Sequence, residues 1–134
     1  MKHILLSLTL VFAFPLFAQD ARDTAIQGVI SGQFDAFIAE DVEEAWSYAS
    51  PTIQGMFRTP QNFGMMVENG YPMVWRPTDT QFMELRDEGG SLWQRVQVGD
   101  SSGVYHLLDY KMVQIAGEWR IDAVMYLEQV GVGV

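Results

Sequence analysis

The chain has 134 residues, of which 49% are hydrophobic, 13% aromatic and 19% charged, and it contains no cysteine. This length and apolar content fit one globular domain and exclude a disordered chain. The formal net charge of −9 repels phosphate groups and anionic lipid heads, so we expect no nucleic acid and no membrane surface as a partner. Without cysteine, disulfides, thiol catalysis and thiolate-bound metals are excluded.

The N-terminus has the order of regions that is typical of a secretory signal peptide. A short basic start, Met1–His3, precedes an apolar run over residues 4–14, and Ala18 offers a small residue for cleavage. The alternative, a membrane anchor, needs about 20 apolar residues, and the polar pair Gln19-Asp20 follows too soon. We therefore expect residues 1–18 to be removed near Ala18, which makes the mature protein periplasmic or secreted.

The first half of the mature chain carries apolar residues at three- and four-residue steps, the spacing of amphipathic helices. The apolar stripe of the first helix comprises Ile26, Ile30, Phe34, Phe37 and Ile38. Gly28 and Gly32 weaken this helix, so we expect another element to pack closely against it. A short second helix follows Asp41, which is an N-cap with Glu44 three residues later, and it ends at Pro51.

Two further helical segments are expected before the strands. Residues 52–57 are expected to form a single extra turn. Thr59 is an N-cap followed by Pro60, and the helix that begins there has an apolar face of Phe63, Met66 and Val67. Gly70 then suits a left-handed cap at the C-terminus of this helix.

Beyond Tyr71 the apolar residues recur with a period of two, which predicts strands. Glycine-rich turn signals delimit four of them, near residues 80–88, 91–98, 104–115 and 118–127. A shorter strand is expected around residues 73–76, before Pro77. We therefore expect one domain over residues 19–130, followed by a flexible tail of residues 131–134.

Charge supports one register for the hairpins. It places Glu84 opposite Arg95 and Lys111 opposite Asp122, and facing opposite charges stabilise a sheet. One face is then nearly all apolar and must be covered by the helices; it holds Met83, Leu85, Leu92, Val96, Val98, Val104, His106, Leu108, Tyr110, Met112, Trp119, Ile121, Ala123, Met125 and Leu127. The other face holds Phe82, Glu84, Arg86, Trp93, Arg95, Gln97, Tyr105, Leu107, Asp109, Lys111, Val113, Arg120, Asp122, Val124 and Tyr126.

Helices followed by an antiparallel meander with one covered face resemble the nuclear transport factor 2-like superfamily, which includes ketosteroid isomerase and the polyketide cyclases. Three segments, AWSYASPTIQGMF (45–57), YPMVWRP (71–77) and GEWRI (117–121), resemble an exported bacterial family described only as a domain of unknown function. The resemblance covers nearly all of the mature chain. It implies an α+β fold in which N-terminal helices pack on a curved antiparallel sheet that forms a cone with a pocket, and it supplies no catalytic residues.

Aromatic and methionine side chains are expected to converge at the open end of this cone. Apolar walls with a few polar groups are typical of a small-molecule site. The expected lining residues are Phe57, Met65, Tyr71, Trp75, Met83, Gln94, His106, Tyr110 and Trp119. The alternative is that these side chains fill the cavity completely.

His106 and Tyr110 are the candidates for catalysis. His106 is the one histidine that remains after signal removal, and a histidine in a pocket can act as a general base. The alternative is a neutral core histidine that is hydrogen-bonded to a polar neighbour. Enzymes of the resembled superfamily use an acid inside the cone, where the register places only Asp87, beside a turn. No catalytic residue is therefore assigned.

Acidic side chains gather around the junction of the first two helices: Asp35, Glu40, Asp41, Glu43 and Glu44. Their spacing does not match a calcium-binding loop, so we expect a solvated acidic surface. The sequence has no glycine motif for nucleotide binding. We predict no metal and no other cofactor.

Four large side chains are expected on the uncovered face of the sheet, where they would form a patch for homodimerisation: Trp93, Leu107, Val124 and Tyr126. The alternative is a monomer in which arginine stems mask these residues.

Two functions follow from the sequence. The first is an exported domain that binds a small apolar ligand or another protein without catalysis. The second is a small lyase, isomerase or cyclase that uses His106 and Tyr110. The enzyme requires an ionisable group within hydrogen-bond reach of a second polar group in the pocket, whereas the binding domain requires only an open apolar pocket.

Overall fold

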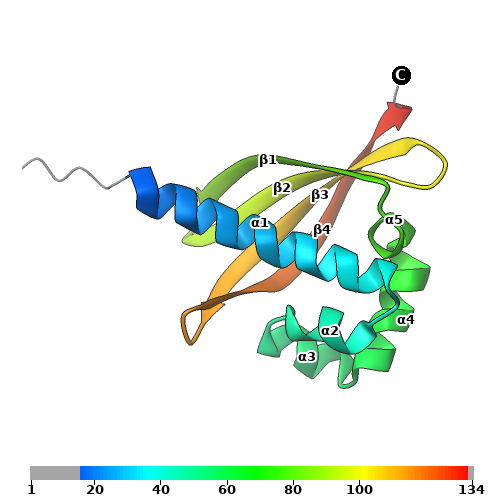
Figure 1. Cartoon of the computed structure of the whole chain (residues 1–134), viewed down its shortest axis with the longest axis horizontal. Coiled ribbons are helices and arrows are strands. Elements are labelled where there is room, and N and C mark those ends of the chain that lie inside the picture. The colour runs from blue at the N-terminus through cyan, green and yellow to red at the C-terminus, as the bar shows by residue number, and fades with distance from the viewer. Residues whose placement is uncertain (1–15, 133–134) are drawn as a thin grey trace, which may run out of the picture.

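The computed structural model of the protein describes residues 16–132. Residues 1–15, which hold most of the expected signal peptide, lie outside this part of the chain. Within it, five helices precede one antiparallel sheet with the strand order β1-β2-β3-β4 (Figure 1). The elements are α1 (Leu16–Ile38), α2 (Val42–Ser47), α3 (Pro51–Phe57), α4 (Pro60–Gly70), α5 (Pro72–Trp75), β1 (Asp79–Glu88), β2 (Ser91–Gly99), β3 (Val104–Ile115) and β4 (Glu118–Val132). This order confirms the expected α+β class.

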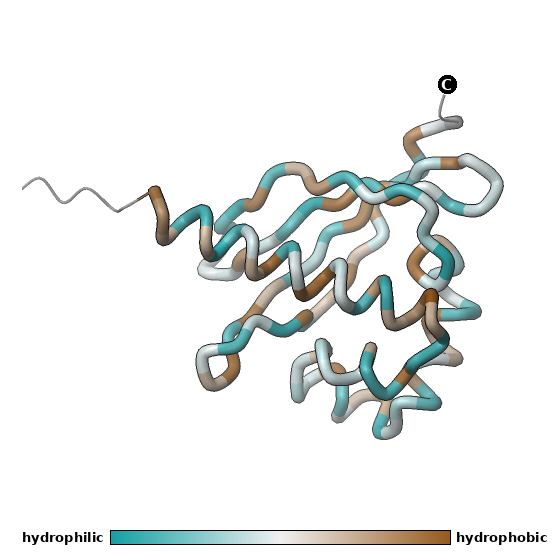
Figure 2. Tube along the Cα trace, in the orientation of Figure 1, coloured by the Kyte–Doolittle hydropathy of each residue, from teal (hydrophilic) through white to brown (hydrophobic). Residues whose placement is uncertain are grey.

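The long helix α1 lies across one face of the curved sheet and contacts β4 (Figure 1). Its buried stripe contains Ile26, Ile30, Phe34 and Phe37, as expected, whereas Ile38 at the end of the helix is half exposed. Apolar residues recur along α1 and along the strands that it covers (Figure 2). Between α1 and the sheet, the core also contains Leu108, Tyr110 and Ile121, so this contact contributes to the hydrophobic stabilisation of both layers.

Close packing against α1 is confirmed at one of its two glycines. A Cβ atom at Gly32 would lie 2.6 Å from the hydroxyl oxygen of Tyr48, which is the C-cap residue of α2. A Cβ atom at Gly28 would meet no atom within 4 Å. Gly32 therefore allows α2 to approach α1, whereas no contact explains Gly28.

Side-chain caps begin the helices where the sequence predicts them. The carboxylate of Asp41 accepts a hydrogen bond from Glu44 N, and the Thr59 hydroxyl accepts one from Asn62 N. Ser50 caps α3 in the same way, and Pro51 follows it, so the expected single turn is a helix of seven residues. The prediction that Gly70 forms a left-handed cap is wrong, because Gly70 belongs to α4 and Tyr71 is the C-cap of that helix.

The strand expected over residues 73–76 is also wrong. Residues Pro72–Trp75 form the helix α5, in which Met73 and Val74 are buried. Proline at the first helical position fits a helix start, and four apolar residues are too few to show a period. No helix within residues 16–132 is long and apolar enough to cross a membrane.

The charge pairs that defined the register are present. A guanidinium nitrogen of Arg95 lies 2.9 Å from a carboxylate oxygen of Glu84, and Lys111 Nζ lies 3.6 Å from Asp122 Oδ2. In the backbone pairing, however, Lys111 lies opposite Ala123 and not opposite Asp122, where the sequence had predicted it. Gly89 and Gly90 have positive φ angles of 60° and 81°, which the tight turn between β1 and β2 requires.

Bulges change the faces of residues beyond these pairs. In β1 the register shifts between Phe82 and Leu85, so Phe82 pairs with Val96 and packs against the core, while Met83 is exposed. The register between β3 and β4 shifts as well, beside Lys111 and Met112. One extra residue in a strand moves every following side chain to the opposite face.

The β4 shift corrects the expected dimer face. Val124 pairs with Tyr110 and Tyr126 pairs with Leu108, so both residues lie on the helix-covered face. Met125 pairs with Asp109 and lies on the uncovered face, where the sequence had predicted Val124 and Tyr126. β4 also extends to Val132 and includes Gly131, which the sequence assigned to the tail. Residues 133–134 lie outside the described chain.

Candidate functional site

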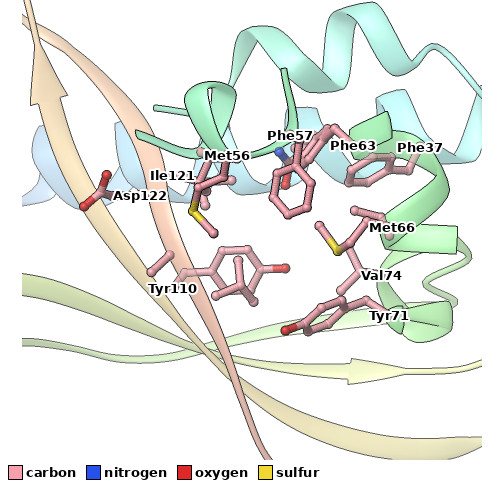
Figure 3. Close-up of a pocket in the computed structure, with 15 residues that line it drawn as sticks. Phe37, Met56, Phe57, Phe63, Met66, Tyr71, Val74, Tyr110, Ile121 and Asp122 are labelled. Carbon is pink, nitrogen blue, oxygen red and sulfur yellow. The ribbon is translucent and has the colours of Figure 1, made fainter. Parts of the chain in front are cut away.

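An apolar cavity of about 240 Å³ lies between the helical end of the molecule and the sheet. Its walls come from α1, α3, α4 and α5 on one side and from β3 and β4 on the other (Figure 3). The lining residues are Gln33, Phe37, Ile53, Met56, Phe57, Phe63, Met66, Val67, Tyr71, Val74, Tyr110, Ile121, Asp122, Ala123 and Val124. The side chains leave this volume open. The alternative considered from the sequence was that they fill the cavity completely.

Tyr110 is the most deeply placed polar side chain of the wall. It is fully buried, and its ring packs edge-on against Phe34 at 6.1 Å between centroids. Its hydroxyl oxygen points toward the cavity, among Phe57, Met66 and Tyr71 (Figure 3), and it has no hydrogen-bond partner within the described residues. Burial first, and the nearby Tyr71 second, raise the pKa of Tyr110 far above its ordinary value, so the hydroxyl keeps its proton.

The other buried polar groups of the wall already have partners. The side-chain amide of Gln33 donates to the Ala45 carbonyl at 3.2 Å. Asp122 accepts a hydrogen bond of 2.7 Å from the Ser50 hydroxyl and is paired with Lys111. In Figure 3 its carboxylate points away from the cavity. The Tyr110 hydroxyl is therefore the fully buried polar group of this wall that remains unpaired in the described chain.

Three of the nine expected pocket residues line this cavity: Phe57, Tyr71 and Tyr110. The other six do not. Met65 and Met83 are exposed on the surface, because Met65 lies on the outer side of α4 and Met83 at the β1 bulge. Trp75 packs against Phe37 at 5.7 Å between centroids, and Trp119 borders a separate surface depression beside Tyr48.

Gln94 is buried, and its side chain bonds to the backbone of the sheet. Its side-chain amide donates to the carbonyl oxygens of Met83 and Arg95, both at 2.9 Å. The first of these bonds joins β2 to the bulged part of β1, so Gln94 fixes the bulge that exposes Met83. The sequence placed Gln94 correctly on the covered face, but the pocket does not extend to it.

Sequence reasoning missed several lining residues. Phe63, Met66 and Val67 form the apolar face of α4 that the sequence did predict, and this face could have been assigned to the pocket. Val124 could not have been found, because its place on the wall depends on the β4 bulge.

His106 lies outside the cavity, in the part of the sheet near the turn between β2 and β3. It is buried, its Nε2 lies 2.8 Å from Asp100 Oδ2, and its Nδ1 lies 2.9 Å from the Tyr126 hydroxyl. This is the alternative expected from the sequence, a core histidine bonded to polar neighbours. Within the described residues, His106 and Tyr110 do not share a pocket.

Asp100 holds this arrangement together. In addition to His106, it accepts hydrogen bonds from Ser102 N at 2.9 Å and Val104 N at 3.0 Å. These bonds, that from His106 above all, hold the pKa of Asp100 well below its ordinary value. The carboxylate therefore stays charged and fixes both the turn and the imidazole.

The uncovered face of the sheet carries a charge network. Arg86 donates to both carboxylate oxygens of the buried Asp109, at 2.9 Å and 2.6 Å, and Arg95 is paired with Glu84. Trp93 and Leu107 lie on this face, as the sequence predicts, but they are half-buried rather than fully exposed.

The acidic side chains near the end of α1 are held by local contacts. Glu40 is paired with Arg76 at 2.8 Å, Asp41 caps α2, and Glu44 accepts a hydrogen bond from the Tyr48 hydroxyl at 3.2 Å. No group of three or more potential metal ligands occurs within residues 16–132.

The helices on one face of a curved four-stranded sheet, with a cavity between the layers, define a domain with the nuclear transport factor 2-like fold. Two solved structures share it at 16% sequence identity. One is an NTF2-like protein of unknown function from Shewanella baltica OS155, with a TM-score of 0.51 over 83% of this chain and 94% of that one. The other is a hexachlorocyclohexane dehydrochlorinase (LinA) of type 2, with a TM-score of 0.50 over 87% and 93%.

The family follows from the sequence match. The family model described as a domain of unknown function, DUF4864, matches residues 19–134, and the chain belongs to that family. No curated protein matches the sequence. The match begins at the residue that follows the expected cleavage site.

Proposed function

We propose that this protein is an exported domain that binds a small apolar molecule in the cavity without catalysis. The observation that carries the proposal is the open volume of about 240 Å³ with a nearly all apolar wall. An apolar cavity of about 150 Å³ is enough to bind benzene in an engineered protein, so a larger one has room for a somewhat larger molecule. The hydrophobic effect supplies the binding free energy.

The alternative enzyme has less support. It requires a base near the Tyr110 hydroxyl, and His106 bonds instead to Asp100 and Tyr126. Asp122 lines the wall, but Ser50 and Lys111 already occupy its carboxylate. The likeness to a dehydrochlorinase concerns the fold alone.

Export would determine the compartment in which the protein binds its ligand. The expected signal peptide would bring the domain to the periplasm or outside the cell, so it would bind a molecule that is present there. Native mass spectrometry of protein purified from its own periplasm tests this directly. A bound small molecule of constant mass is the expected result, and only the apo mass after gentle purification would count against the proposal.

Three methionines allow a test in solution. Met66 lines the cavity and is half-buried, and Met56 lines it while being 69% exposed, so Met56 lies where the cavity opens to solvent. Met65, on the same helix as Met66, is exposed to solvent and does not line the cavity. In a methyl-labelled sample, an apolar probe should shift the signals of Met56 and Met66 and leave that of Met65 in place. Replacing Val124 of the wall with phenylalanine should fill the cavity and remove these shifts, and Met65→Phe is the matched control.

A further inference from the structure

We propose that the ligand is an uncharged, largely apolar molecule with one hydrogen-bond acceptor, such as a ketone, aldehyde or ether oxygen, and that the Tyr110 hydroxyl binds this acceptor. The inference rests on the proposed function and specifies the class of molecule. By comparison with a benzene-sized cavity, the volume has room for on the order of ten non-hydrogen atoms.

The buried hydroxyl of Tyr110 lacks a hydrogen-bond partner in the described chain. Tyr110 is fully buried in the wall, and its hydroxyl points toward the cavity but has no partner within the described residues. A buried hydroxyl without a hydrogen bond destabilises a protein, and phenylalanine would fill the same space without that cost. A ligand atom that accepts the proton would complete the bond.

The direction of this hydrogen bond follows from the surroundings of Tyr110. Burial keeps the hydroxyl protonated, so it can donate. In Figure 3 it lies among Phe57, Met66 and Tyr71, of which only Tyr71 has a strong hydrogen-bonding group, a hydroxyl that can also donate to a ligand. The complementary ligand atom is therefore an acceptor oxygen.

Charge on the ligand is disfavoured by the composition of the wall. Among the described residues, no lysine, arginine or histidine lines the cavity, so a carboxylate or phosphate would be buried without a counter-ion. Asp122 is the acid of the wall, and it already has Ser50 and Lys111 as partners, which leaves it little attraction for an ammonium group. An uncharged molecule avoids both costs.

The apolar part of the ligand is less narrowly specified. Met56 and Met66 lie on the wall, and methionine side chains adapt to different shapes because they are unbranched and flexible. We therefore expect the acceptor atom, rather than the exact outline of the hydrocarbon, to determine which molecules bind best.

Three probes of similar size test the inference. Acetophenone has a carbonyl oxygen, α-methylstyrene replaces that oxygen with a methylene group, and benzoate carries a negative charge. Each is titrated into the mature protein while the methyl signals of Met56 and Met66 are recorded. The variants are Tyr110→Phe and, as a control, Tyr105→Phe, which removes a hydroxyl that is bonded to Asp79 outside the cavity.

The expected result is that acetophenone binds roughly three- to tenfold more tightly than α-methylstyrene, which is the range for one hydrogen bond. Benzoate should bind much more weakly than either. The preference for acetophenone should vanish in Tyr110→Phe and persist in Tyr105→Phe. Binding of α-methylstyrene should be the same in all three proteins.

Other outcomes separate the two proposals. If α-methylstyrene binds and acetophenone has no advantage, or if the advantage survives in Tyr110→Phe, the inference about the acceptor is overturned while the apolar binding function stands. Tighter binding of benzoate would overturn the uncharged class. If none of the probes moves the signals of Met56 or Met66, the binding function itself is overturned, together with the inference.

Discussion

The hydroxyl of Tyr126 lies 2.9 Å from Nδ1 of His106, on the helix-covered face of the sheet. The sequence pattern assigned these two residues to opposite faces, and a bulge in β4 brings them together. The contact gives the buried imidazole a second polar partner besides Asp100. It also removes Tyr126 from the surface on which a second copy of the chain would dock.

Replacing Asp100 with asparagine should destabilise the protein in a pH-dependent way. The pKa of Asp100 is lowered in the folded state from its usual 3.8, so its carboxylate stabilises the fold above about pH 4, and this contribution is lost as the pH falls toward the folded pKa. Charge-assisted bonds of this kind contribute about 1.5–3 kcal/mol. Urea denaturation of wild type and Asp100→Asn should show this difference at pH 7 and a smaller one at pH 3.

The exposed Asp87, near the turn between β1 and β2, provides the control. Asp87→Asn should change the free energy of unfolding by less than about 0.5 kcal/mol, as is usual for surface substitutions. Equal losses in the two variants, or a loss in Asp100→Asn that is as large at pH 3 as at pH 7, would contradict the role of the Asp100 carboxylate.

Two substitutions of Tyr110 should have different effects on stability. Tyr110→Ala removes a fully buried ring and should cost about 3–5 kcal/mol. Tyr110→Phe removes only an unpaired hydroxyl, and it should leave the free energy of unfolding unchanged or raise it by about 1 kcal/mol. Denaturant melts measure both values, and a large loss in Tyr110→Phe would reveal a bonded hydroxyl.

Export should produce a mature chain that begins near Gln19. N-terminal sequencing of the protein from a periplasmic fraction identifies the first residue, and a chain that retains Met1 in that fraction would refute cleavage. Replacing Ala18 with arginine should block processing, because the peptidase requires a small residue before the cleaved bond.

We propose that two copies of the mature chain associate through the uncovered face of the sheet. Met125 is 53% exposed there, on the face that also carries Trp93 and Leu107. The Arg86–Asp109 pair neutralises charge beside them and could belong to the polar rim of such an interface. Sedimentation of the mature protein should show a dimer.

The variants Met125→Asp and Met65→Asp separate this interface from a general effect of added charge. Met65 is exposed to a similar degree, 57%, but it lies on α4, away from the sheet face. Only Met125→Asp should dissociate the dimer. A wild-type protein that sediments as a monomer at all concentrations would disprove the association.

Short-range patterns in the sequence determined most of the elements. Asp41 and Thr59 predicted helix starts because a capping side chain bonds to a backbone N–H only three residues away. Gly89 and Gly90 predicted a hairpin for an equally local reason, the positive φ angles of its turn. The resemblance to a known family placed these elements in the correct fold.

Only the tertiary structure decided which face several residues occupy and which of them form the cavity. Val124 joined Tyr110 on the cavity wall because a bulge in β4 shifts the pairing by one residue, and alternation then reverses the face. The residues 72–75 became a helix because Pro72 and the buried Met73 and Val74 fit against α4 and β2. The sequence could not predict that the Tyr110 hydroxyl is unpaired, because whether a buried group has a hydrogen-bond partner depends on atoms that are distant in the chain.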